Sequence, residues 1–295
     1  MDIDDLYKSL GLERPSDGEN KHQPDGDHIK ARIDQTLNFN KTRNIFWRKW
    51  YAIAASLAFL IISAAGIYNY TVHNSWSEDM ITITAPSGGT REVILPDSSR
   101  VWLNAASVLR YPASFGKTRE VFLEEGEGFF QVKRDTMAPF TVHSSHLDTR
   151  VLGTSFRVKA YKELSHEIVT VVSGKVAVSR GAEPLALLEK DQEVIFDKNS
   201  GNEKEMLVEA AESVDWKSGN VILKSVRFED LILAVENAYQ VSIHFDRQKF
   251  KECENSIRFS THQSLESVMD LVRDIQGIRY EIKGKEVIVS GEGCQ

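Results

Sequence analysis

One long apolar run interrupts an otherwise mixed pattern of hydrophobic and polar positions. Between Trp50 and Ser77 there is no Asp, Glu, Lys or Arg, and 16 of the 20 residues from Tyr51 to Tyr70 are apolar. Twenty helical residues reach about 30 Å, which matches the hydrocarbon core of a bilayer. A helix in a soluble core would show a polar stripe at helical spacing, and this run has none. The pattern predicts one transmembrane helix over residues 50–70.

The flanks of the run predict its orientation. Residues 35–49 carry four basic side chains and no acid, whereas the first charges after the run are Glu78 and Asp79. The positive-inside rule therefore places the N-terminus in the cytoplasm. The 49 residues before the run are too many for the charged start of a cleaved signal peptide, so we expect the helix to remain as an anchor.

Two short amphipathic stripes precede the span. They comprise Ile3, Leu6, Tyr7 and Leu10, then Ile29, Ile33 and Leu37, and a polar, turn-rich stretch separates them. Helices this short bury too little surface to offset the entropy of ordering. Residues 1–49 are therefore expected to be a short cytoplasmic helical segment that folds against a partner, or else a disordered tail.

The chain beyond the span divides into two regions of different pattern. Short runs rich in Val, Ile, Phe and Thr predict strands at 80–86, 91–96, 100–104, 119–133, 140–145, 149–161, 167–179 and 192–197. These runs favour an all-β periplasmic domain over residues 80–198, arranged as a sandwich, a roll or a solenoid-like stack. The sequence alone does not choose among the three. Residues 71–79 and 199–219 are expected as linkers.

Residues 220–295 contain an internal repeat. A strand, helix and strand over residues 220–246 recur over residues 256–282, with apolar positions offset by 37 residues. Each half supplies a helix whose apolar face is covered by the flanking strands. The expected fold is a C-terminal α+β domain of order βαββαβ, followed by a turn into residues 286–290.

Composition narrows the classes of function. The chain has 36 Lys and Arg against 43 Asp and Glu, a formal charge of −7, which argues against direct binding of nucleic acid through phosphate neutralisation. Cys253 and Cys294 are the only cysteines, too few for a disulfide scaffold or a zinc site. A bridge between them is permitted outside the membrane, and the sequence leaves that pairing open.

Other apparent sites carry weaker signals. His143 and His146 are three apart, which on a strand directs them to opposite faces and disfavours a shared metal. Glu124, Glu125 and Glu127 crowd one strand and turn rather than flank a cleft, so we expect a solvated edge instead of glycosidase carboxylates. The sequence predicts that the protein binds no metal ion and no cofactor and that it is not an enzyme.

Several motifs between Thr82 and Ser179 resemble the FecR family of transmembrane sigma-factor regulators. The matching stretches are APSGGTREVILPDSSRVWLNAASVLRYPASF, REVFLEEGEGFFQV, APFTV, VLGTSFRV and VVSGKVAV, in that order. The repeat domain is similar to the short N-terminal module of secretins and TonB-dependent transporters. The resemblance implies an anti-sigma factor in the inner membrane, single-pass, with a cytoplasmic N-terminus and a periplasmic C-terminus.

The resemblance also implies partners on both sides of the membrane. In the cytoplasm it implies an extracytoplasmic-function (ECF) sigma factor, for which we expect apolar anchors at Leu6, Leu10, Ile29, Ile33 and Leu37. In the periplasm it implies the N-terminal signalling domain of a TonB-dependent outer-membrane transporter for an iron chelate or a glycan. Membrane lipid and an intramembrane protease complete the expected partners. The alternative is a membrane-tethered periplasmic adaptor that binds a transporter or glycan without transcriptional control.

One peptide bond carries a chemical hypothesis. Some relatives break their own chain between Gly and Thr in a motif that corresponds to Gly153-Thr154 here. The Thr154 hydroxyl would attack the preceding carbonyl to form an ester, which water then opens. The alternative interpretation, which we favour, is that Gly153 makes a β-bulge and Thr154 a strand contact.

Overall fold

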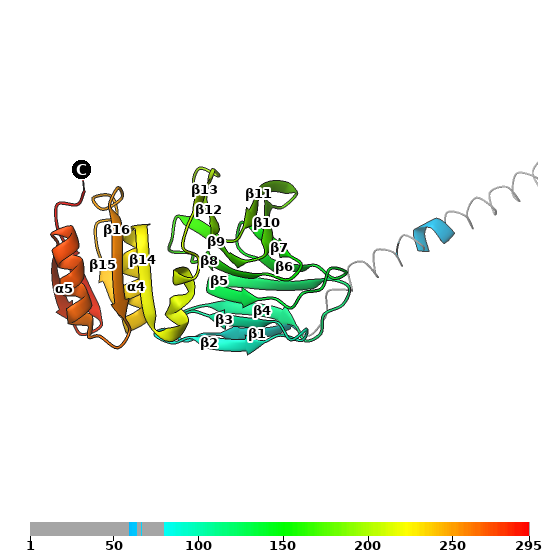
Figure 1. Ribbon diagram of the computed structural model, residues 1–295, viewed down its shortest axis with the longest axis horizontal. Coiled ribbons are helices and arrows are strands. Elements are labelled where there is room, and N and C mark those ends of the chain that lie inside the picture. The colour runs from blue at the N-terminus through cyan, green and yellow to red at the C-terminus, as the bar shows by residue number, and fades with distance from the viewer. Residues whose placement is uncertain (1–58, 64–65, 67–79, 295) are drawn as a thin grey trace, which may run out of the picture. The chain divides into compact units, whose positions relative to one another are not determined.

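The computed structural model describes residues 59–63, 66 and 80–294, and the fold is reported for these residues (Figure 1). Residues 59–63 and 66 are helical. Within the described residues, no helix combines the length and apolar character needed to cross a bilayer. The predicted span over 50–70 lies mostly outside the described residues, and the predicted cytoplasmic segment 1–49 and linker 71–79 lie wholly outside them.

Residues 80–207 fold into a β domain. Its strands are β1 (Met80–Thr84), β2 (Arg91–Ile94), β3 (Arg100–Leu103), β4 (Val108–Pro112), β5 (Arg119–Gln131), β6 (Phe140–His143), β7 (Asp148–Val151), β8 (Ser155–Ala160), β9 (His166–Ser173), β10 (Lys175–Arg180), β11 (Glu183–Glu189), β12 (Gln192–Asp197) and β13 (Glu203–Leu207). They hydrogen-bond along the path β11-β10-β7-β6-β5-β8-β9-β12-β13, with β4 and β3 also paired to β5.

The long strand β5 belongs to both halves of this sheet. Its first residues pair with β4 and β6, and its last residues pair with β3 and β8. Buried side chains of both halves, such as Leu109 and Val142 on one side and Phe130 and Val169 on the other, form one core. Of the three arrangements that the sequence leaves open, the domain is therefore sandwich-like.

Three strands are absent from the sequence prediction. Strand β4 ends at Pro112, β11 carries Pro184 near its start, and β13 is a charged strand at the edge of the sheet. Proline and charged residues are common in edge strands and at strand ends, but in sequence they also indicate turns. For that reason the pattern did not predict these three strands. The single run predicted over 149–161 is divided into β7 and β8 at Gly153.

The C-terminal domain contains the predicted repeat. Its elements are β14 (Asn220–Arg227), α4 (Phe228–Tyr239), β15 (Ser242–His244), β16 (Glu254–Ser260), α5 (Leu265–Gln276), β17 (Arg279–Lys283) and β18 (Glu286–Ser290). Strand β14 pairs with β16, and β15 pairs with β18. The first pair joins the two halves of the repeat, and the second joins the first half to the strand that follows the repeat. The halves therefore interlock around one core that includes Phe228, Leu231, Val268 and Val272.

The segment 199–219, expected as a linker, carries regular structure. It contains β13 and the 3₁₀ helix η1 (Glu212–Ser218), which Gly219 ends in a left-handed conformation. Val214 and Trp216 of η1 are buried against Phe129 of β5. The connection between the two domains is thus packed onto the β domain before β14 begins.

Candidate functional site

The two outer domains meet across a buried contact, which is the most chemically distinctive place among residues 80–294. Helix α4 contributes Leu233, which packs on Tyr161 and Leu164 in the loop between β8 and β9. Beside this apolar contact, charged side chains from both domains are enclosed.

Lys159, His166 and Asp230 form the centre of that interface. Lys159 lies on β8, His166 on β9 and Asp230 in the first turn of α4. The Lys159 Nζ atom is 2.5 Å from Asp230 Oδ1, and His166 Nε2 is 3.2 Å from the same oxygen. The three residues are only 7%, 3% and 2% exposed, respectively. A buried charge is tolerated when its partner is equally enclosed, so these side chains depend on one another.

Glu229 extends the cluster to the rim of the interface. The Ser165 hydroxyl donates a 2.6 Å hydrogen bond to Glu229 Oε1, and Arg247 Nη1 lies 3.2 Å from Glu229 Oε2. Arg227 Nη1 in turn donates to the Ser165 hydroxyl at 2.6 Å. The second carboxylate is therefore also held by groups of both domains, with its cations more exposed.

The enclosure shifts the ionisation of the central groups. Burial by itself raises the pKa of Asp230, but the positive charges of Lys159 and His166 outweigh it and hold that pKa below its ordinary value. Burial lowers the pKa of His166, whereas hydrogen bonding to Asp230 and Glu229 raises it, with a net upward shift. The interface thus favours an ionised carboxylate facing two cationic groups.

His166, Glu229 and Asp230 are residue types that bind metal ions, and their ligand atoms lie within 4.8 Å of one another. The two carboxylates nevertheless approach different ring nitrogens, Asp230 at Nε2 and Glu229 at Nδ1, 3.6 Å away. Lys159 already neutralises the Asp230 oxygen that an ion would need. The geometry therefore fits an interdomain ion-pair cluster and not a metal centre.

The candidate self-cleavage bond lies between β7 and β8. Gly153 has φ +149°, and a Cβ atom there would come within 2.5 Å of the Arg134 Cα. The Thr154 hydroxyl donates a 2.9 Å hydrogen bond to the Lys175 carbonyl, which ties the start of β8 to β10. The register shift of the β8–β9 pair is between Ser155 and Phe156, which begins two residues after Gly153 and not at it. This geometry gives both residues structural roles.

The two histidines considered as metal ligands do not form a common site, because each contacts a different carboxylate. His143 Nδ1 lies 2.6 Å from Asp148, whereas His146 Nδ1 lies 2.7 Å from Glu167, so the two rings contact different carboxylates. The five expected sigma-factor anchors, Leu6, Leu10, Ile29, Ile33 and Leu37, lie outside the described residues.

The expectation of a solvated edge is wrong for Glu127. Glu124 and Glu125 pair with Arg110 and Lys162, whose side chains are exposed. Glu127 is only 5% exposed and accepts from Arg157, because β5 has by then passed from one half of the sheet into the other. Three glutamates close together in sequence therefore did not indicate that the last of them becomes buried.

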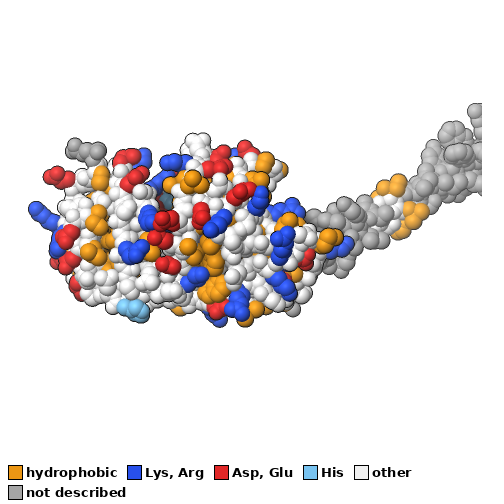
Figure 2. Space-filling view, viewed as in Figure 1, with side chains coloured by type: hydrophobic (Ala, Val, Ile, Leu, Met, Phe, Trp, Pro, Cys, Tyr) orange, Lys and Arg blue, Asp and Glu red, His pale blue; other side chains and the backbone are white. Residues whose placement is uncertain are grey.

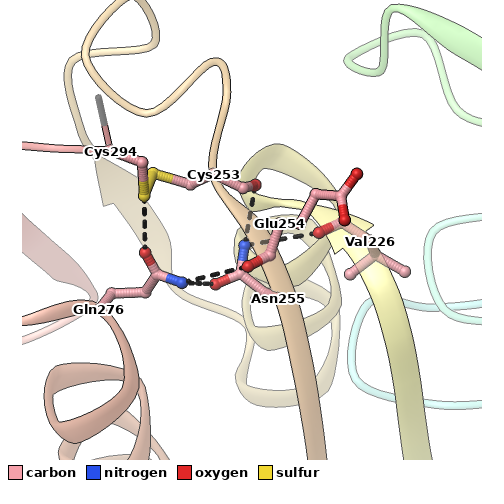
Figure 3. Close-up of a disulfide and its surroundings, with 6 residues drawn as sticks. All are labelled: Val226, Cys253, Glu254, Asn255, Gln276 and Cys294. Atoms are coloured by element: carbon pink, nitrogen blue, oxygen red, sulfur yellow. Dashed lines mark hydrogen bonds between the residues drawn. A yellow bond between two sulfur atoms is a disulfide. The ribbon is translucent and has the colours of Figure 1, made fainter.

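Cys253 and Cys294 form the disulfide that the sequence leaves open (Figure 3). The Asn255 side chain donates to the Cys253 carbonyl at 3.1 Å and accepts from the Gln276 side-chain amide at the end of α5. The bridge therefore fastens the C-terminal tail beside α5 and the start of β16. Cys253 itself is buried in the domain core.

Comparisons with known proteins agree with this architecture. Residues 81–177 match the family model described as FecR protein, and residues 220–289 match the model described as FecR, C-terminal. A comparison with curated protein sequences finds no match.

Two crystal structures, at 2.50 and 1.65 Å resolution, of a candidate anti-sigma factor from Parabacteroides distasonis are similar to the chain. Both show 30% sequence identity and a TM-score of 0.67, over 71% of this chain and 98% of the solved one. With both family models matched in order and a solved relative aligned over nearly its full length, the chain belongs to the FecR family of anti-sigma factors.

Proposed function

We propose that this protein is an inner-membrane anti-sigma factor with its N-terminus in the cytoplasm and its two outer domains in the periplasm. It binds an ECF sigma factor through residues 1–49 and releases or activates it on a periplasmic signal. The observation that carries the proposal is the likeness, over 71% of the chain, to a candidate anti-sigma factor at 30% identity. The charge-free run before residue 78, with basic residues on its N-terminal side, supports the anchor and its direction.

We further propose that the outer region receives its signal from the N-terminal domain of a TonB-dependent transporter. Within residues 80–294, strands β14, β15, β16 and β17 each have only one strand partner in the C-terminal domain. An unpaired strand edge can accept an extended segment of another protein through backbone hydrogen bonds. The buried Lys159–Asp230 pair would then couple such a contact to the β domain.

The protein acts in this proposal by binding and not by catalysis. Self-cleavage at Gly153-Thr154 is the single chemical step that the sequence raises, and the Thr154 hydroxyl is engaged with Lys175. An intramembrane protease would be a partner that acts on the chain.

Capture of a sigma factor by the full-length protein tests the cytoplasmic half of the proposal. The tagged chain is co-expressed with each ECF sigma factor of its own genome and purified in detergent. We expect one sigma factor to be retained, and we expect Leu6→Asp with Ile33→Asp to abolish retention because charges would replace apolar anchors. Retention of none, or equal retention by the variant, would favour the periplasmic adaptor. Reporter fusions at both ends check the topology separately.

A further inference from the structure

One end of the β domain is basic although the chain as a whole is acidic, with a formal charge of −7. Segments 113–118, 133–139, 150–154 and 174–175 meet there, and we call them together the basic end. Asp135 is their only acid, and their basic residues are Lys117, Lys133, Arg134, Arg150 and Lys175. Figure 2 shows Lys and Arg side chains gathered at the end of the β domain that lies away from the C-terminal domain.

A buried arginine holds the segment 133–139 in place. Arg119 Nη1 donates to the Lys133 carbonyl at 2.9 Å, and its Nε donates to the Ala138 carbonyl at 2.8 Å. The Asp135 amide donates to the Leu152 carbonyl at 2.8 Å, which joins the second segment to the third. Hydrogen bonds of the fold therefore hold the backbone that carries Lys133, Arg134 and Arg150.

The charges of this surface are available to a partner. Lys117, Lys133, Arg134 and Arg150 are exposed, and among residues 80–294 no carboxylate forms an ion pair with them. Apolar side chains accompany them, because Met137 is 90% exposed and Leu152 is 45% exposed. Cations around exposed apolar side chains fit an anionic lipid surface, where headgroups take the charges and the boundary of the acyl chains takes the apolar groups.

The position of this surface in the chain identifies the occupant. Met80, where β1 begins, pairs with Pro112, and residue 112 leads directly into the first segment of the basic end. Nine residues separate the proposed span, ending at residue 70, from Met80, which limits the distance to about 30 Å. We propose that the basic end docks on the anionic phospholipid headgroups of the same membrane that the span crosses. This inference rests on the anchor in the proposed function.

Because the span would tether the β domain to the membrane, a weak contact is sufficient for the basic end to dock. Each Lys or Arg near an anionic surface contributes roughly five-fold in affinity, and a short tether supplies a high effective concentration. Glu78 and Asp79 in the tether offset two of the charges, so the contact is one that a transporter could break. Docking would hold the outer domains against the membrane until a signal releases them.

Vesicle flotation of residues 75–295 tests the docking surface without the span. Residues 75–295 form one of the two compact units of the chain, and the match covers 98% of the solved relative, so we expect the fragment to fold without the rest of the chain. We expect it to float with vesicles that contain phosphatidylglycerol and to sink with pure phosphatidylcholine. K133Q with R134Q should weaken binding roughly 30-fold, and M137D should weaken it too.

The matched control is K249Q with K251Q, which removes two exposed lysines of the C-terminal domain and should leave flotation unchanged. Equal binding to both vesicle types, no binding at low salt, or equal loss in the control would overturn the proposal. None of these results depends on a sigma factor, so a failure here is distinguishable from a failure of sigma-factor capture.

Discussion

Lys159 of the β domain and Asp230 of the C-terminal domain form a buried ion pair, with Nζ and Oδ1 2.5 Å apart, although the two residues are 71 positions apart in sequence. The pair lies where the first turn of α4 faces β8 and β9. Because both side chains are almost completely buried, the pair makes the two domains depend on each other, and disrupting it is the most direct way to separate them.

Removing one partner of this pair should destabilise the outer region strongly. D230A leaves Lys159 and His166 buried without their common acceptor, so we expect the free energy of unfolding to fall by about 3–5 kcal/mol. Urea denaturation of residues 75–295 measures this. The exposed pair Lys175–Glu189 provides the control, because solvent screens an exposed ion pair and E189Q should leave the urea midpoint nearly unchanged.

A double replacement separates charge burial from simple loss of contact. K159M with D230L removes both charges and should be less harmful than D230A alone, since no lysine charge is left buried and His166 still has Glu229 beside it. If the double variant is as unstable as D230A, the ion pair is not the source of the effect.

His166 should make stability depend on pH near neutrality. Its pKa is raised in the folded protein, so its contribution is fully present below the unfolded value near 6.5 and is lost as pH rises through the folded pKa. Lys159, Glu229 and Asp230 are the charged groups that face it. We expect the urea midpoint of the wild type to decline above about pH 6.5.

H166Q should lack this part of the pH profile, and H244Q, which changes an exposed histidine far along the chain, should retain it. Asp230 should make stability depend on pH in acid. Its lowered pKa gives stability that is present above the unfolded value near 3.9 and is lost only in stronger acid. A wild-type profile that is flat from pH 6 to 9 would contradict the role assigned to His166.

The sequence predicted elements where a local pattern determines them. The apolar spacing predicts helices over 227–239 and 264–275, and α4 and α5 begin and end within one residue of these ranges, because the same pattern and flanking strands recur in both halves. The ion-pair cluster had no such pattern, since Lys159, His166 and Asp230 come from three elements and only the fold brings them together. One residue could have indicated this interface. Leu233 is apolar but lies beside the core stripe of α4, and such a residue suggests that the helix contacts a second surface.

The disulfide should stabilise the C-terminal domain against unfolding. It closes a loop with a sequence separation of 41, for which the loss of chain entropy in the unfolded state corresponds to about 4 kcal/mol. C253S with C294S, or the wild type under reductant, should therefore unfold at a lower temperature in calorimetry. Alkylation of both cysteines in the unfolded, unreduced protein would show that the bond is not formed.

Gly153 should tolerate no side chain, whichever role Thr154 has. G153A places a Cβ atom 2.5 Å from the Arg134 Cα in a backbone with φ +149°, so strain of about 1–3 kcal/mol or more is expected. G116A is the control, because its Cβ would meet open space and the change should stay within about 0.5 kcal/mol.

Intact mass distinguishes the two interpretations of the same bond. If Gly153 and Thr154 only shape the connection between β7 and β8, expressed residues 75–295 remain one species, and T154A loses the hydrogen bond to Lys175 at a cost of about 1 kcal/mol without any change in chain length. If the hydroxyl attacks the Gly153 carbonyl, two fragments appear with time and T154A abolishes them. We expect the single species, because the Thr154 hydroxyl is already committed as a donor to the backbone of β10.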